Sequence, residues 1–256
     1  MANKDLQQPD SAEISISAGP WAKFYAEYPI GFVQAIVWLA ASTGAQLGMA
    51  KLIKQGYVTI HDGLPEFSFQ ILVMLGFTFV LLAYWKFVRK AQLRTLGLRI
   101  DRLAGDLKFA LVAAIAMGLL YLALAGVYWT VLQVFFDDGQ EMFRSHLRGA
   151  IFKDSSALYF VGVVIFFPIL EEIWFRGLMY TPMRREWGRW PAILILSVLF
   201  AAAHNVTFPI NQFLGGMIFV WAYEKRQSLV APILLHIAGN GSLAVIGWAI
   251  VKWQLL

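Results

Sequence analysis

The chain contains no cysteine and few charged residues. Without cysteine, disulfide bonds, thiolate metal ligands and a cysteine nucleophile are excluded, so any metal site must use His, Asp or Glu. Charged residues make up 14% of the 256 residues, whereas hydrophobic residues make up 59%. So small a charged fraction cannot cover a water-facing surface, and the composition predicts an integral membrane protein.

Apolar runs long enough to cross about 30 Å of hydrocarbon recur along the chain. We expect an all-α, polytopic transmembrane helical bundle with about seven spans, and the sequence leaves an eighth open. No internal repeat, low-complexity tract or separate soluble domain is evident, so residues 1–256 are predicted to form a single integral membrane domain. The fifth and sixth runs are short, and neighbouring helices are expected to shield them. The seven runs cover residues 29–50, 67–88, 107–136, 157–179, 190–204, 209–223 and 229–253.

The residues before the first run are polar and then aromatic. Residues 1–17 lack a basic start followed by a short apolar core and a small-residue cleavage site, so no cleavable signal peptide is expected. Trp21, Phe24, Tyr25 and Tyr28 follow, and such a cluster before a span predicts an aromatic anchor at the membrane interface.

Basic residues predict the orientation. Residues 86–108 carry seven Lys and Arg residues, so this connection is expected on the cytoplasmic side. Counting spans from it places the amino terminus and the basic residues near 184–189 and 225–226 on the same side. The net charge of +5 is explained by this topology, and no nucleic-acid partner is expected. On the outer side, apolar residues at helical spacing in 142–151 predict a short interfacial helix, with a structured loop as the alternative.

Two adjacent carboxylates, Glu171 and Glu172, lie inside an apolar run. A charge near the centre of a bilayer costs about 2.5–3.5 kcal/mol even on lenient scales, so the pair predicts a functional site. Arg176 lies four residues after Glu172, on the same helix face, where it can neutralise that carboxylate while Glu171 points elsewhere. A purely structural Glu172–Arg176 ion pair is an equally open alternative.

Two further polar patterns follow, Phe200 with His204 and His236 with Asn240. Counted at about 1.5 Å per helical residue from the basic ends, the glutamates and both histidines lie roughly 15–22 Å deep, so they can meet. Pro168, one turn before the glutamates, deletes a backbone hydrogen bond and is expected to bend its helix and open a cavity.

Together these patterns resemble the CAAX protease and bacteriocin-processing (CPBP) family of intramembrane proteases, which includes the type II CAAX prenyl endopeptidases. The resemblance covers residues 166–242, within a motif-bearing core of about 156–245. It rests on three motifs in order: Glu171-Glu172 with Phe175-Arg176-Gly177, Phe200 with His204, and His236 with Asn240.

The resemblance implies hydrolysis of peptide bonds in membrane-associated or lipidated substrates, within or near the membrane. Glu171 and His204 are expected to activate a water, and Arg176 to keep Glu172 ionised. His236 and Asn240 are expected to donate hydrogen bonds to the developing oxyanion.

The sequence leaves open whether a metal takes part and whether the chain has a function other than proteolysis. Glu171, His204 and His236 would also make an acceptable zinc site with a vacant position for water. A metal-free mechanism is slightly favoured, because neither histidine lies in a His-Glu-x-x-His pattern. The alternatives to a protease are an ion- or proton-coupled transporter, which the lack of repeat symmetry disfavours, and a catalytically idle membrane scaffold or regulator, which the intact motifs disfavour.

Overall fold

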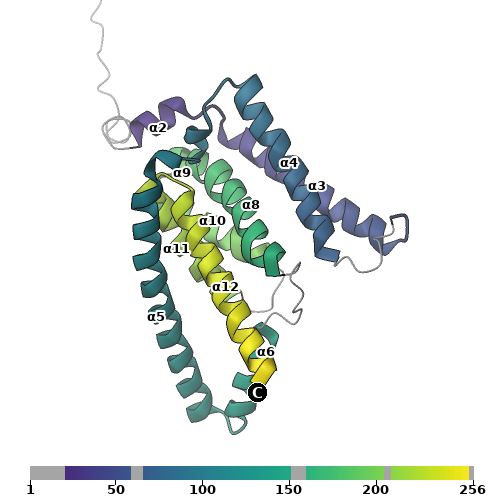
Figure 1. Cartoon of the computed structure of the whole chain (residues 1–256), viewed down its shortest axis with the longest axis vertical. Coiled ribbons are helices and arrows are strands. Elements are labelled where there is room, and N and C mark those ends of the chain that lie inside the picture. The colour runs from purple at the N-terminus through teal and green to yellow at the C-terminus, as the bar shows by residue number, and fades with distance from the viewer. Residues whose placement is uncertain (1–20, 59–65, 151–159, 205–208, 254–256) are drawn as a thin grey trace, which may run out of the picture.

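The computed structural model describes residues 21–58, 66–150, 160–204 and 209–253, and within these residues it is a helical bundle without strands (Figure 1). The all-α prediction is therefore confirmed. The first half consists of α2 (Ala22–Glu27), α3 (Phe32–Lys54), α4 (Glu66–Ala83) continued by η1 (Tyr84–Val88), the short η2 (Leu93–Leu96) and η3 (Ile100–Arg102), α5 (Leu103–Phe135) and α6 (Gly139–Ala150).

The second half begins with one continuous helix that carries the first motif. Its successive parts are η4 (Gly162–Phe166), α8 (Phe167–Glu172), η5 (Ile173–Tyr180) and α9 (Thr181–Trp187), of which η4 and η5 are π-helical. We call it the motif helix. Three helices follow: α10 (Arg189–Ala202), α11 (Ile210–Arg226) and α12 (Val230–Trp253).

Four described helices are long and apolar enough to cross a membrane: Phe32–Lys54, Phe69–Val88, Ile100–Phe135 and Val230–Ala249. They match the first, second, third and seventh predicted spans. The predicted count of seven is not confirmed. Of the fourth predicted run, residues 160–179 lie in the motif helix, which is not among these four helices, and residues 157–159 lie outside the described part of the chain. The fifth and sixth runs form α10 with 14 residues and α11 with 17, which give about 21 and 25 Å at 1.5 Å per residue. Both lengths are shorter than the hydrocarbon layer of about 30 Å.

The four long helices expose apolar side chains over much of their length. Val37 on α3, Phe79 on α4 and Leu122 on α5 are all more than half exposed. Soluble proteins rarely expose apolar surface this continuous, whereas a bilayer covers it. Together with the length of these helices, the surface identifies an integral membrane protein.

The motif helix lies at the centre of the core. Within η5, Trp174, Leu178 and Tyr180 have 2% of their surface exposed or less. The Trp174 indole N–H donates to the Thr78 hydroxyl of α4 at 2.8 Å, so its one polar atom is satisfied in the core. α4 is thereby fixed against the helix that carries the glutamates.

The aromatic residues before α3 are buried in this core. Trp21, Phe24, Tyr25 and Tyr28 are 4–8% exposed, which contradicts the predicted anchor at the lipid interface. The Tyr28 hydroxyl lies 2.7 and 2.8 Å from the carbonyl oxygens of Gly177 and Leu178. The segment packs inward because the motif helix offers it acceptors and, together with α11, aromatic faces: the Trp21 ring contacts Tyr180 of the motif helix and Tyr223 of α11.

Basic connections gather at one end of the bundle. Arg184 binds Glu224 through two nitrogens at 2.7 and 2.8 Å, and Arg226 lies 2.6 Å from Asp106. Arg185 donates to the carbonyl oxygen of Ile30 at 3.3 Å. These contacts join connections that the charge pattern predicts on the same side of the membrane.

At the other end, residues 139–150 form a helix, as predicted, rather than a loop. α6 turns back along α5 at this end (Figure 1), where the Phe143 ring lies 5.9 Å from Tyr128 and 4.9 Å from Trp129. The last residue of the predicted apolar pattern, at position 151, lies outside the described residues.

Candidate active site

Because of Pro168, one backbone carbonyl of the motif helix lacks a backbone N–H donor. The side chain of Asn240 donates to this carbonyl instead. In η4 the Phe167 N–H donates to Gly162, five residues back, so the next carbonyl, that of Val163, would need an N–H at position 168. Proline has none. The Asn240 side-chain amide of α12 donates to the Val163 oxygen at 2.9 Å instead. The backbone stays helical through Phe167, so the chain accommodates Pro168 with a π-helical turn, and the expected bend and cavity stay predictions.

One turn after Pro168, hydrogen bonds link three buried side chains in a row. The Glu172 Oε1 atom lies 2.9 Å from Arg176 Nη1 and 2.9 Å from His236 Nδ1. Glu172 and Arg176 are fully buried and His236 is 4% exposed. The predicted contact between Glu172 and Arg176 is confirmed, and the third motif joins it through His236.

This contact fixes which ring nitrogen of His236 carries a proton. A carboxylate paired with an arginine only accepts hydrogen bonds, so Nδ1 is the donor. In neutral His236 the Nε2 atom is then an acceptor. Nε2 lies 3.7 Å from Oε2 of Glu171, whose side chain is 19% exposed. This separation exceeds a direct hydrogen bond, and the two groups face each other across it.

Aromatic rings surround the buried cation. The Arg176 guanidinium lies 4.5 Å from the centre of the Phe200 ring and 5.4 Å from that of Phe219, which in turn stacks on His236 at 4.6 Å. Arg176 also donates to the carbonyl oxygen of Gly216 at 3.1 Å. Desolvated cation–π contacts contribute about 2 kcal/mol, so the rings replace part of the lost hydration of the arginine.

His204 lies next to the Phe200 ring. Its Nδ1 is 2.7 Å from the Phe200 carbonyl oxygen, which can only accept, so Nδ1 carries the proton and Nε2 of the neutral ring is free to accept. The Phe200 ring lies 4.7 Å from His204 and 5.7 Å from His236. Among the described residues, no hydrogen bond or ion pair joins His204 to either glutamate.

The comparisons with known proteins bear on the same segment of the chain. Residues 153–242 match the family described as type II CAAX prenyl endopeptidase Rce1-like. All three motifs lie in this Rce1-like segment, so the family resemblance is confirmed there.

One relative is a protein of Escherichia coli described as "Uncharacterized 24.3 kDa protein". It is 35% identical over 96 residues, which cover 34% of this chain and 44% of that protein. The match thus spans less than half the length of the relative. No solved structure matches the chain significantly.

The close packing of η2 against the motif helix explains the glycine at position 177. A Cβ atom on Gly177 would lie 2.7 Å from Leu96 Cδ2 and 3.1 Å from the Leu96 carbonyl oxygen. Only glycine allows η2 to approach the motif helix this closely. Gly177 therefore supports the site through backbone packing.

The described residues of the Rce1-like segment do not form a metal site. Glu171, His204 and His236 are the candidate ligands, yet no three His, Asp or Glu side chains in the described part of the chain are grouped to hold a metal ion.

Proposed function

We propose that the chain is an intramembrane endopeptidase that hydrolyses peptide bonds of membrane-associated or lipidated substrates. The observation that carries the proposal is the buried Arg176–Glu172–His236 chain, which ends with His236 facing the partly exposed Glu171. The match of the motif-bearing segment to Rce1-like endopeptidases supports the same reaction class.

Glu171 is the proposed general base. It accepts a proton from a water while the water oxygen adds to the carbonyl carbon of the scissile peptide bond. The same carboxyl group then returns the proton to the leaving nitrogen as the C–N bond breaks. One water is consumed, so a new carboxyl and a new amino terminus are formed.

The histidines have different proposed tasks. The Nε2 atom of His204 accepts a hydrogen bond from the water and orients it towards the substrate. His236 can donate to the developing oxyanion only when Nε2 is also protonated, and the Glu172 carboxylate stabilises that imidazolium. A preorganised donor of this kind is worth about 10²–10³ in rate.

Asn240 has one amide hydrogen engaged by Val163. We propose that it first fixes α12 against the motif helix and that its second amide hydrogen is the one available to an oxyanion. The metal-free route is part of the proposal, with zinc as the alternative.

The proposed arrangement in the membrane is seven spans with the amino terminus in the cytoplasm. The gathered basic connections support a common side for residues 27–30, 102–106, 184–189 and 224–226. Substrates would reach Glu171 from the bilayer or from the cytoplasmic side.

The deciding experiment compares new peptide termini in membranes of cells that express the wild type or Glu171→Gln at matched levels. We expect termini that occur with the wild type and disappear in the variant, because an amide cannot accept the proton of the water. Glu186→Gln is the control, since Glu186 is an exposed glutamate of α9 in the same helix. It should give the wild-type set of termini.

Full-rate cleavage of a validated substrate by Glu171→Gln would overturn the proposal. Identical termini with and without the wild-type protein would instead favour the scaffold or the transporter.

A further inference from the structure

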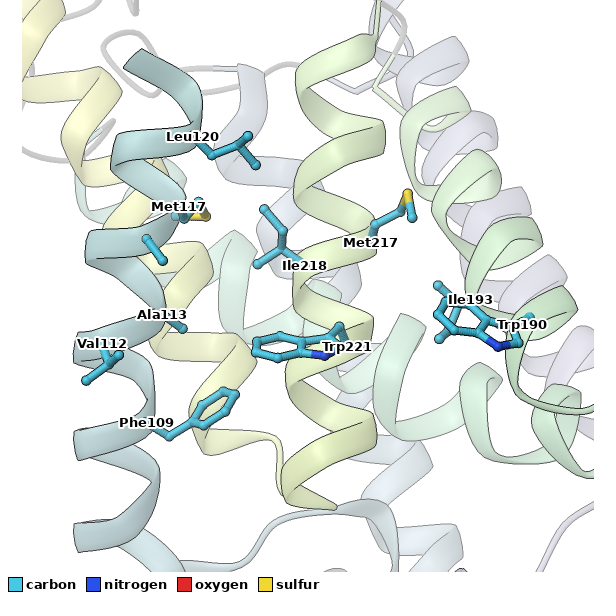
Figure 2. A pocket seen from close by; sticks show the side chains of 11 residues that line it. Phe109, Val112, Ala113, Met117, Leu120, Trp190, Ile193, Met217, Ile218 and Trp221 are labelled. Carbon is cyan, nitrogen blue, oxygen red and sulfur yellow. The ribbon is translucent and has the colours of Figure 1, made fainter. Parts of the chain in front are cut away.

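An apolar groove of about 440 Å³ lies between α5, α11 and α10 (Figure 2), and neither Glu171 nor Glu172 lines it. Phe109, Val112 and Leu120 line it from α5, and Ile218 and Trp221 line it from α11. Every other side chain that lines it is also apolar. A ligand of this groove must therefore present hydrocarbon to it.

The separation of α5 and α11 along the groove is fixed, because one contact joins the two helices at each end of it. At the basic end of the bundle, the Arg226 Nε atom lies 2.6 Å from the buried Asp106. Towards the other end, the Tyr121 hydroxyl donates to the Asn211 carbonyl oxygen at 3.0 Å. The two helices cannot close the groove by sliding together without breaking these contacts.

The length of the groove fits one lipid chain. From Phe109 to Leu120 the lining of α5 extends about 16 Å at 1.5 Å per residue. One leaflet contributes half of a hydrocarbon layer of about 30 Å, or about 15 Å. The groove therefore spans one leaflet, beginning at the basic end.

Two lysines lie where a lipid headgroup would begin. Lys108 precedes Val112 by four residues on α5, and Lys225 follows Trp221 by four residues on α11, so each lies on the groove side of its helix, one turn towards the basic end. Both are exposed. Arg226, which follows Lys225 in the chain, is neutralised by Asp106, which leaves the two lysines to attract an anion.

We propose that this groove is a binding site for an anionic glycerophospholipid of the leaflet at the basic end. One acyl chain lies along the groove, and the phosphate lies between Lys108 and Lys225. The charge pattern favours this occupant over a zwitterionic lipid, because each nearby basic residue adds about 1 kcal/mol of attraction to anionic headgroups. The proposal is independent of the protease reaction, since no residue of the active site takes part.

The test uses the full chain in phosphatidylcholine vesicles that contain a variable fraction of lipid with brominated acyl chains. Bromine quenches tryptophan fluorescence at contact, and the Trp221 contribution is the difference between the wild type and Trp221→Phe. We expect quenching at Trp221 to saturate at a lower fraction of brominated phosphatidylglycerol than of brominated phosphatidylcholine. Equal fractions for the two lipids would overturn the proposal.

Two sets of variants separate the groove from general surface charge. Lys108→Gln with Lys225→Gln should weaken the phosphatidylglycerol preference by about fivefold per lysine. The control Lys23→Gln with Lys86→Gln removes the same charge from exposed lysines elsewhere on the chain and should retain the preference. An equal loss in both pairs would overturn the proposal.

Ala116→Phe tests the hydrocarbon part, because Ala116 is an exposed residue that lines the groove. The larger ring should fill the groove and abolish the preference for phosphatidylglycerol at Trp221. A preference that persists in this variant would contradict binding of the acyl chain in the groove.

Discussion

At the scale of single residues, one carboxylate oxygen of Glu172 accepts from both Arg176 and His236. The other oxygen, Oε2, and the Nε atom of Arg176 are buried without a hydrogen-bond partner in the described structure. A buried ion pair that is incompletely satisfied contributes little net stability. The role of the Arg176–Glu172 ion pair is therefore better explained by the orientation of His236 than by the stability of the fold.

A double-mutant cycle separates these two effects. Arg176→Met should lower the free energy of unfolding by about 3–5 kcal/mol, because it leaves the Glu172 carboxylate buried and unpaired. Adding Glu172→Met should restore part of that loss, whereas cleavage should be absent in the double variant because His236 has lost its orienting carboxylate. The fraction of folded protein in detergent against denaturant measures stability. Losses that simply add would contradict the coupling.

Several site residues could be predicted from the sequence because their cost or spacing is visible there. Glu171 and Glu172 are conspicuous in an apolar run, Arg176 follows from helical spacing, and His236 follows from its depth. The contacts of Arg176 with the Gly216 carbonyl and the Phe219 ring depend on how α11 packs against the motif helix. A backbone oxygen and one phenylalanine among many carry no signal in the sequence.

At the scale of elements, the segment 21–30 holds the motif helix in place. Burial raises the pKa of the Tyr28 hydroxyl well above its ordinary value, so it remains a protonated donor over the physiological range. Its oxygen lies within hydrogen-bond distance of two successive carbonyls, those of Gly177 and Leu178, at the end of the first motif. The amino-terminal segment is thus part of the support of the candidate site.

Tyr28→Phe tests that support. Loss of the hydroxyl leaves buried carbonyl oxygens without this donor, and the free energy of unfolding should fall by about 1–3 kcal/mol. Tyr57→Phe is the matched control, because Tyr57 is 78% exposed and its hydroxyl should contribute little. Chemical denaturation in detergent measures both variants. Equal stability of Tyr28→Phe and the wild type would contradict the role of the segment.

Some elements can be predicted well from the sequence, whereas others cannot. Long apolar runs such as those that form α3 and α5 predict membrane-spanning helices, and the structure has helices of sufficient length there. The shorter α10 and α11 are ambiguous, because a helix buried in protein and a helix in lipid have the same composition. Aromatic residues such as Trp21 and Tyr25 likewise suit an interface or a core, and only the packing distinguishes the two.

At the scale of the whole molecule, orientation can be measured directly because the chain has no native cysteine. Tyr57→Cys lies in the connection after α3 and Glu186→Cys lies in α9, and both positions are exposed. A membrane-impermeant maleimide should label position 57 in intact cells and position 186 only after the membrane is opened. Labelling of both positions from the same side would contradict the predicted arrangement of spans.

The length of α5 affects how the molecule meets the water beyond the membrane. Its 33 residues extend about 50 Å, and even a tilt of 40° leaves about 38 Å along the membrane normal. This exceeds a hydrocarbon layer of about 30 Å, so the far end of α5 projects beyond the lipid chains. The turn at Asp137 and Asp138 is thereby lifted towards open water, and α6 turns back to cover Trp129. A hydrophilic epitope inserted at this turn would be accessible to an antibody while the membrane-embedded helices remain undisturbed.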